Sequence, residues 1–299
     1  MKRQVVSLFT RRFICVAVCL LLCKGVSAWC GPLSESPFKL RAGLIWVQVD
    51  SPCGGNPLQF ILDSGAEASV MDLQTARRLH LELGQPVTVR GITSTTLGFR
   101  TQSLPPRMGG VDLPTNFLAM DLSALSAACH RQVDGLVGAD FFAGRVVQID
   151  FARDKIRLLA KSKPGVKAEV LPLRIQALRL RVPVEVVGLG KAWARLDTGC
   201  ASALHWAVST QVLASQDSSQ ELGVGVTSVQ IRQNNQSVRL GRLTLDHVST
   251  GLHTEKLLAE EDGLLGAGLL SHFALVTIDE PAGQLILEDF ANPKPHSRR

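Results

Sequence analysis

Two short segments of this 299-residue chain hold residue types that can activate a water molecule. Asp63-Ser64-Gly65 and Asp197-Thr198-Gly199 each place a carboxylate, a hydroxyl and a glycine in a row, directly after an apolar run. The glycine permits a tight turn or the close approach of another group. The hydroxyl can steady the turn by hydrogen bonds to nearby backbone. We therefore expect two carboxylates held on two rigid turns.

Two such turns could act together on one water molecule if they face each other. Asp63 and Asp197 would then reach one water molecule. Two like charges at that distance cannot both form, so the pair shares a proton and titrates in two coupled steps. The ionised carboxylate takes a proton from the water, while the protonated one polarises a substrate carbonyl. This arrangement would hydrolyse a peptide bond without a metal and without a covalent intermediate.

The sequence around each aspartate is repeated, which indicates an internal duplication. The separation from Asp63 to Gly138 is 75 residues, and that from Asp197 to Gly266 is 69 residues. Each half closes with a predicted hairpin. Three blocks recur in one order: 60–66 with 193–200, 133–139 with 261–267, and the hairpins 147–158 with 276–287.

These motifs resemble those of a known family. Residues 63–67, Asp-Ser-Gly-Ala-Glu, resemble the active-site loop of retropepsins, the retroviral-type aspartic proteases, and 197–200 resemble that loop in retropepsins or pepsins. The blocks 135–140 and 263–266 resemble the second motif of the family, which buttresses the catalytic turn. The resemblance implies two retropepsin-like domains on one chain, in bacterial style. The implied fold is mainly β, a two-lobed acid-protease (pepsin/retropepsin-like) fold with an active-site cleft between the lobes.

The resemblance also implies an activity, namely that of an acid-active aspartic endopeptidase that needs no cofactor and no metal and acts on a peptide or protein substrate. A catalytically inactive module of the same fold, gripping extended peptide by strand addition, is the alternative. A third reading is a processing protease with a single envelope partner. The implied site residues are the catalytic Asp63 and Asp197, the orienting Ser64 and Thr198, and the turn-shaping Gly65 and Gly199.

The N-terminus reads as a targeting segment. Basic residues at 2, 3, 11 and 12 precede the apolar run 13–22, and Val26-Ser27-Ala28 offers small residues for a signal peptidase. The apolar run is short for a spanning helix, which needs about 20 apolar residues. We predict a cleaved signal peptide and a secreted or periplasmic protein without stable membrane insertion, with an uncleaved membrane anchor as the alternative.

The remaining chain divides at changes in composition. We expect a monomer in which the two lobes pair within the molecule. The predicted segments are a signal peptide over 1–28, a lead-in over 29–40, lobe 1 over 41–160, a linker over 161–172, lobe 2 over 173–290 and a tail over 291–299.

Charge and motif content exclude several other classes of function. Segment 1–28 holds five basic and no acidic residues, so its removal lowers the formal net charge from +6 to +1. Nucleic acid is therefore not an implied partner. The seven histidines form no HExxH pattern, and no Gly-x-Ser-x-Gly elbow occurs. Cys30, Cys53, Cys129 and Cys200 remain after the signal, and their pairing stays open among three schemes.

Some features depart from the family pattern. The chain has no tyrosine, so a flap tyrosine of the pepsin type has no equivalent, and flaps are expected at 90–99 and 223–238. Arg195 lies two residues before Asp197, on the same face of a strand. A cation there either lowers the pKa of the aspartate or pairs with another acid.

Overall fold

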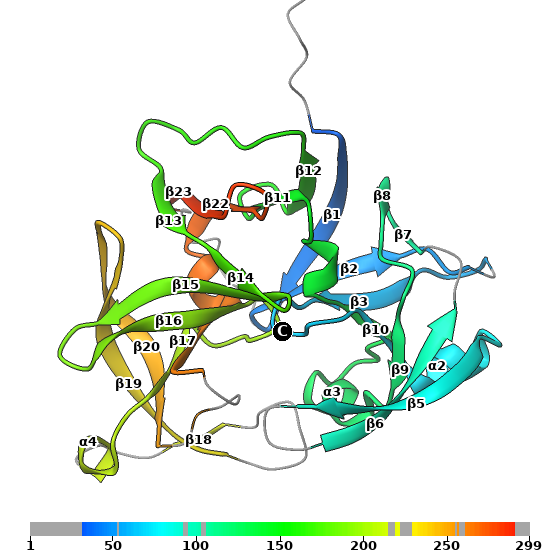
Figure 1. The fold of residues 1–299 in the computed structure, drawn as a ribbon, viewed down its shortest axis with the longest axis horizontal. Coiled ribbons are helices and arrows are strands. Elements are labelled where there is room, and N and C mark those ends of the chain that lie inside the picture. Colours follow the sequence, from blue (N-terminus) through cyan, green and yellow to red (C-terminus); the bar gives the residue numbers. More distant parts are fainter. Residues whose placement is uncertain are drawn as a thin grey trace, which may run out of the picture. The chain divides into compact units, whose positions relative to one another are not determined.

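The computed structural model describes residues 32–52, 54–91, 95–102, 106–214, 219–221, 229–254, 256 and 261–290. Contacts divide the chain into Met1–Pro32 and Leu33–Arg299. The second unit is mainly β (Figure 1). The predicted signal peptide over 1–28 and the predicted tail over 291–299 lie outside the described residues. Among the described residues, no helix has the length and apolar character needed to cross a membrane.

Seven neighbouring strands of a larger sheet form what we call the first set. Strand β3 pairs in parallel with β10, β10 is antiparallel to β4, and β4 is parallel to β9. The strands lie in the order β2 (Leu44–Val49), β3 (Leu58–Leu62), β10 (Gly135–Val137), β4 (Val70–Asp72), β9 (Leu118–Met120), β6 (Thr95–Gln102) and β5 (Glu82–Arg90).

A second set repeats this order in another sheet. Strand β16 is parallel to β21, β21 is antiparallel to β17, and β17 is parallel to β20. Strand β14 (Arg174–Gln176) lies at the edge next to β15. The order is β15 (Arg179–Val186), β16 (Gly190–Asp197), β21 (Gly263–Gly266), β17 (Leu204–Ala207), β20 (Leu243–His253), β19 (Val229–Leu240) and β18 (Ser219–Glu221).

The two predicted closing hairpins are present. β11 (Val146–Asp150) pairs with β12 (Lys155–Leu159), and β22 (Phe273–Asp279) pairs with β23 (Gln284–Phe290). The hairpins are also joined to each other, because β11 and β22 are antiparallel neighbours. These four strands belong to the larger sheet, and Figure 1 shows them together, apart from the strands of the second set.

Two segments expected outside the lobes contain strands. Within the predicted lead-in, β1 (Ser34–Arg41) pairs first with β12 and then with β2. Within the predicted linker, β13 (Glu169–Pro172) pairs with β23. Pro37 and Pro172 disguise both strands in the sequence, since proline is disfavoured inside a sheet. Burial of alternate residues explains the strands: Phe38 is 4% exposed and packs edge-on against Phe151.

Short helices connect the strands. Helix α2 (Leu73–Arg78) begins after Asp72, whose side chain accepts the Thr75 N–H at 3.0 Å and caps the helix. The chain leaves the helical conformation by His80, which adopts a φ of 54°. The other helical segments are α3 (Ser123–Ala128), η1 (Ala139–Phe141), α4 (Thr210–Ala214) and α5 (Ala267–Leu270).

The first predicted flap region is a hairpin, in which β5 and β6 pair up to Arg90 and Thr95. Residues 92–94 at its tip lie outside the described residues. Of the second predicted flap, 223–228 lie outside the described residues, and 229–238 belong to β19. The role of either hairpin as a flap stays a prediction.

The core is formed by alternate residues of the strands. In β15 every second residue is buried, which places Leu180, Val182, Val184 and Val186 on one inner face. A large cluster of such residues draws on both sets of strands. A smaller cluster lies on the other face of the first set, beside α3, and includes Leu44, Trp46, Ile61, Val70, Leu125, Val133 and Leu136. Burial of each large side chain contributes roughly 1.5–3 kcal/mol, so these clusters hold the turns that follow β3 and β16 in fixed positions.

Candidate active site

The two aspartate turns follow equivalent strands of the two sets. Asp63 comes directly after β3, and Asp197 is the last residue of β16. Each of these strands lies beside a parallel strand from the predicted buttressing block, with Leu62 opposite Val137 and Asp197 opposite Gly266. The Asp63 N–H donates to the Val137 carbonyl at 2.8 Å, which ties the first turn to its buttress.

Ser64 and Thr198 join the two turns by reciprocal hydrogen bonds. The Ser64 hydroxyl donates to the Leu196 carbonyl at 2.8 Å, and the Thr198 hydroxyl donates to the Leu62 carbonyl at 2.8 Å. Each hydroxyl oxygen also accepts the backbone N–H of the other residue, at 3.0 Å for Thr198 N–H and 2.9 Å for Ser64 N–H. Both side chains are fully buried. Four hydrogen bonds therefore hold one turn against the other.

The two carboxyl groups meet at this junction and share a hydrogen bond. Asp63 Oδ1 also accepts the N–H groups of Gly65 and Ala66 at 3.0 and 3.1 Å. Asp197 Oδ1 accepts the N–H of Gly199 at 3.0 Å. Backbone donors thus fix the orientation of both carboxyls, and the structure brings together all six residues that the sequence singled out.

The glycines are required by the contact between the turns. A Cβ atom on Gly65 would overlap the carboxyl group of Asp197, and one on Gly199 would overlap the carboxyl group of Asp63. The buttressing glycines are also crowded, because a Cβ on Gly138 would strike the Ala68 backbone and one on Gly266 the backbone of Ser202. Each carboxyl therefore lies against bare backbone of the opposite turn.

Burial raises the pKa of both aspartates. For Asp197, burial is the larger cause and the charge of Asp63 the next, and together they raise its pKa to about 8. Burial likewise raises the pKa of Asp63, against the effect of the N–H donors on its carboxylate. A pair of this kind holds one proton over a wide pH range, which is the state that can act as acid and base at once.

Arg195 reaches across to the first turn. Its Nη2 donates to the Gly65 carbonyl at 2.6 Å, and its side chain is 4% exposed. Its nearest carboxylate oxygens belong to Glu261 at 3.7 Å and Glu67 at 3.9 Å. Both expectations for this residue hold in part: it approaches other acids, and its charge also lowers the pKa of Asp197.

Sequence reasoning assigned no role to several neighbouring residues. Glu67 accepts a hydrogen bond from Arg179 at 2.7 Å, which links the first turn to β15. Asp140 accepts the Ser69 hydroxyl at 2.7 Å, and the Ser69 oxygen accepts the N–H of Gly138. The contact between Ser69 and Asp140 could have been suspected from the aligned repeats. The second half replaces both residues together, with Ala203 and Gly268 at the matching positions.

Residues 47–141 match the family model of aspartyl proteases. The matched segment contains the Asp63 turn and its buttressing block, and it ends within η1. A search of curated proteins found no match. The match supports an aspartic protease family for this chain and a peptidase activity, on a mainly β fold.

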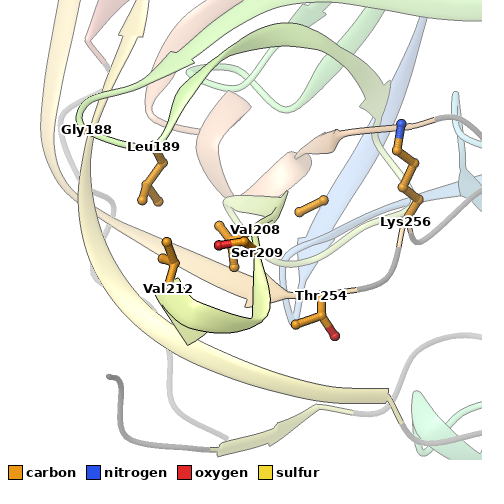
Figure 2. Close-up of a pocket in the computed structure, with 8 residues that line it drawn as sticks. Gly188, Leu189, Val208, Ser209, Val212, Thr254 and Lys256 are labelled. Atoms are coloured by element: carbon orange, nitrogen blue, oxygen red, sulfur yellow. The ribbon is translucent and has the colours of Figure 1, made fainter. Parts of the chain in front are cut away.

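A second surface feature lies in the second set and contains none of the aspartate-turn residues. Figure 2 shows this pocket, with Leu189, Val208 and Val212 on one side and Thr254 and Lys256 on the other. The Lys256 ammonium pairs with Asp262 at 2.9 Å. The pocket combines apolar side chains with the hydroxyls of Ser209 and Thr254 and with the ion-paired Lys256.

The described residues include histidine, cysteine and acidic side chains, which are the types that bind metal ions or supply a thiol. These residues hold no group of three or more His, Cys, Asp or Glu side chains arranged to bind a metal ion. Cys129 is a free thiol whose pKa is raised by burial. Cys30 and Cys53 lie outside the described residues, so the pairing of the cysteines stays open.

Proposed function

We propose that this protein is an aspartic endopeptidase in which Asp63 and Asp197 activate one water molecule. The observation that carries the proposal is the reciprocal hydrogen bonding of Ser64 and Thr198, which presses the two carboxyls together. A structural turn gains nothing from two buried carboxyls in contact, because their repulsion and desolvation oppose folding. Water activation uses that same arrangement.

Each residue of the site has a distinct task in the proposed reaction. The ionised aspartate accepts a proton from the water as the oxygen attacks the scissile carbonyl carbon. The protonated aspartate donates a hydrogen bond to the carbonyl oxygen, where negative charge develops. Ser64 and Thr198 keep the carboxyls close together, and Gly65 and Gly199 leave room for them.

We propose further that the site lies in a cleft between two lobes, 41–160 and 173–290, that arose by duplication. The matching strand orders of the first and second sets support this origin. An extended peptide would lie across both turns, and the hairpin formed by β5 and β6 would cover it as a flap. The lobes belong to one chain, so a monomer would suffice for activity.

The location of the protein is also a proposal. The basic and apolar N-terminal segment 1–28 supports export by a cleaved signal peptide to the periplasm or the medium. Substrates would then be envelope or extracellular proteins. An uncleaved segment would hold the same enzyme at the membrane.

The test is a cleavage assay on a peptide library between about pH 3 and pH 7, read by mass spectrometry. The mature protein should cut internal peptide bonds in the acid part of this range, and the Asp63→Asn variant should not. Binding of library peptides without cleavage at any pH would instead identify a peptide-binding module of the same fold. Cleavage that survives in Asp63→Asn would point to a contaminating protease or another mechanism.

A further inference from the structure

The two sets of strands differ sharply at three matched positions next to the aspartates. The first two positions are matched by strand pairing. Ile61 lies opposite Trp46 in the first set, and Arg195 lies opposite Arg181 in the second. On their other sides these residues pair with Leu136 and Leu264, which are also equivalent. The third position is two residues before the first glycine of each buttressing block. The first set has the apolar trio Trp46, Ile61 and Val133, and the second set has the charged trio Arg181, Arg195 and Glu261.

The charges of this trio do not cancel evenly. Glu261 is 2% exposed and accepts three close hydrogen bonds from Arg181, two from Nε at 2.9 and 3.1 Å and one from Nη2 at 2.7 Å. Arg195 Nη1 approaches Glu261 only to 3.7 Å. The carboxylate is thus neutralised mainly by Arg181, and the charge of Arg195 is left over.

The surplus charge of Arg195 is directed at the aspartate pair. Its Nη2 donates to the Gly65 carbonyl, and its buried Nε finds no hydrogen-bond partner among the described residues. Gly65 in turn lies against the carboxyl group of Asp197. A buried carboxyl pair that holds one proton carries one negative charge, and a buried charge is costly without an opposite charge nearby.

We propose that Arg195 is a positioning residue that serves as the counter-ion of the singly ionised Asp63–Asp197 pair and fixes the turn at Gly65. The proposal rests on the proposed function and deepens it. The two halves then differ in the charge next to their aspartates. Asp63 lies next to an apolar layer, and Asp197 lies next to the cation Arg195. The counter-ion stabilises the reactive, ionised form against full protonation, so activity extends to lower pH.

Other charged and titratable groups lie near Arg195 and also affect the electrostatic potential at the aspartate pair. The acids are Glu67, partly exposed and paired with Arg179, and Glu261, paired with Arg181. His205 of β17 and His253 of β20 lie on the neighbouring strands, with ring centres 6.1 Å apart. His205 lies opposite Leu264, which in turn lies opposite Arg195. Burial lowers the pKa of His205 to about 4, so this histidine adds no positive charge to the layer at higher pH.

The experiment compares pH–rate profiles of peptide cleavage for charge variants of the mature protein. Arg195→Met should move the acid limb of kcat/KM to higher pH by about one unit, because a full protein charge near a carboxyl shifts its titration by that order. Arg195→Lys should restore most of the shift. Glu261→Gln should move the limb to lower pH, because it strengthens the net positive charge beside the pair.

Opposite effects of the two changes distinguish electrostatics from structure. A residue that only supports the fold would lower kcat in both variants without moving the acid limb, and that result would overturn the proposal. The triple variant Arg181→Trp with Arg195→Ile and Glu261→Val rebuilds the apolar layer of the first half, removes the surplus positive charge, and keeps the test open if a single variant fails to fold. Its acid limb should also move to higher pH. Arg239→Met, which removes an exposed pair with Glu185, is the matched control and should leave the profile unchanged.

Failure of the proposed function gives a different result. If the folded wild-type protein cleaves no peptide at any pH, the endopeptidase proposal falls. The counter-ion is then tested by carbon-13 NMR titration of labelled aspartate carboxyls in the wild type and in Arg195→Met. Titration of the pair at higher pH in the variant supports the counter-ion, and unchanged titration overturns it.

Discussion

Ser64 and Thr198 each donate a hydroxyl hydrogen bond to the backbone of the opposite turn, to Leu196 and Leu62 respectively, both at 2.8 Å. Because each oxygen also accepts the N–H of the other residue, the four bonds form a closed arrangement between segments 134 residues apart. Loss of one hydroxyl therefore leaves two buried backbone groups of the opposite turn, a carbonyl and an N–H, without these partners.

The first prediction follows from this arrangement. Thr198→Val keeps the shape of the side chain but removes the donor to Leu62 and the acceptor for Ser64, and we expect it to destabilise the fold by about 1–3 kcal/mol and to abolish most activity. Thr198→Ser keeps the hydroxyl and should retain both the stability and the activity of the wild type. Thr250→Val, which removes a buried hydroxyl that donates to Val248, is the control. It should cost comparable stability in denaturant unfolding but leave the cleavage rate per folded molecule intact.

A second prediction concerns the glycines of the turns. Gly65→Ala or Gly199→Ala inserts a methyl group where the opposite carboxyl lies, so the aspartates must separate. Overpacking of this kind costs about 1–3 kcal/mol, and we expect a large fall in kcat. Gly110→Ala is the matched control, since its Cβ would meet only Ser34 at an ordinary 3.7 Å. Equal activity of the Gly65 and Gly110 variants would refute the close contact.

The third prediction concerns stability against pH. The pKa of Asp197 is raised to about 8 in the folded protein, above its unfolded value of 3.8. The folded state then binds more protons, so the pair favours folding below about pH 4 and its contribution is lost as the pH rises toward 8. Asparagine cannot ionise, so Asp197→Asn should abolish this fall of stability with rising pH. At pH 7 we expect the variant to be more stable than the wild type by at least about 1.4 kcal/mol, the equivalent of one pKa unit. Thermal unfolding at pH 4 and pH 7 measures the difference.

A fourth prediction has the opposite sign. Burial lowers the pKa of His205 from 6.5 to about 4, so the unfolded chain binds more protons between these values. The contribution of this histidine to stability is therefore present above pH 6.5 and lost as the pH falls toward 4. His205→Gln should flatten the fall of stability in this window. If unfolding midpoints of the wild type and the variant decline in parallel, His205 is not the group responsible.

The sequence predicted much of the fold because the repeat made weak patterns reinforce each other. Both closing hairpins, β11 with β12 and β22 with β23, are where the repeat placed them. β1 and β13 were missed because they depend on pairing with β12 and β23, far away in the chain, and not on local propensity. Strand β1 became visible only through the burial of Ser36 and Phe38.

The site was predictable in its residues but not in its electrostatics. The triplets at 63 and 197 identify themselves by type and spacing, since the chemistry requires a carboxylate, a hydroxyl and a glycine in order. The three contacts of Arg181 with Glu261 join residues 80 positions apart, and no local pattern marks them. Alternation placed Arg195 on the correct face, but its contact with the Gly65 carbonyl depends on how the two turns meet.

The central claim is that one water molecule is activated jointly by Asp63 and Asp197. The most direct measurement is kcat/KM for the best library peptide with the wild type, Asp63→Asn and Asp197→Asn, each folded and assayed at its own optimal pH. Either single change should lower kcat/KM by at least about 10²–10⁴-fold, since each removes one of the two carboxyl groups needed for acid–base catalysis. The double variant should be hardly worse than either single one. A single variant that keeps near wild-type activity would contradict the shared pair.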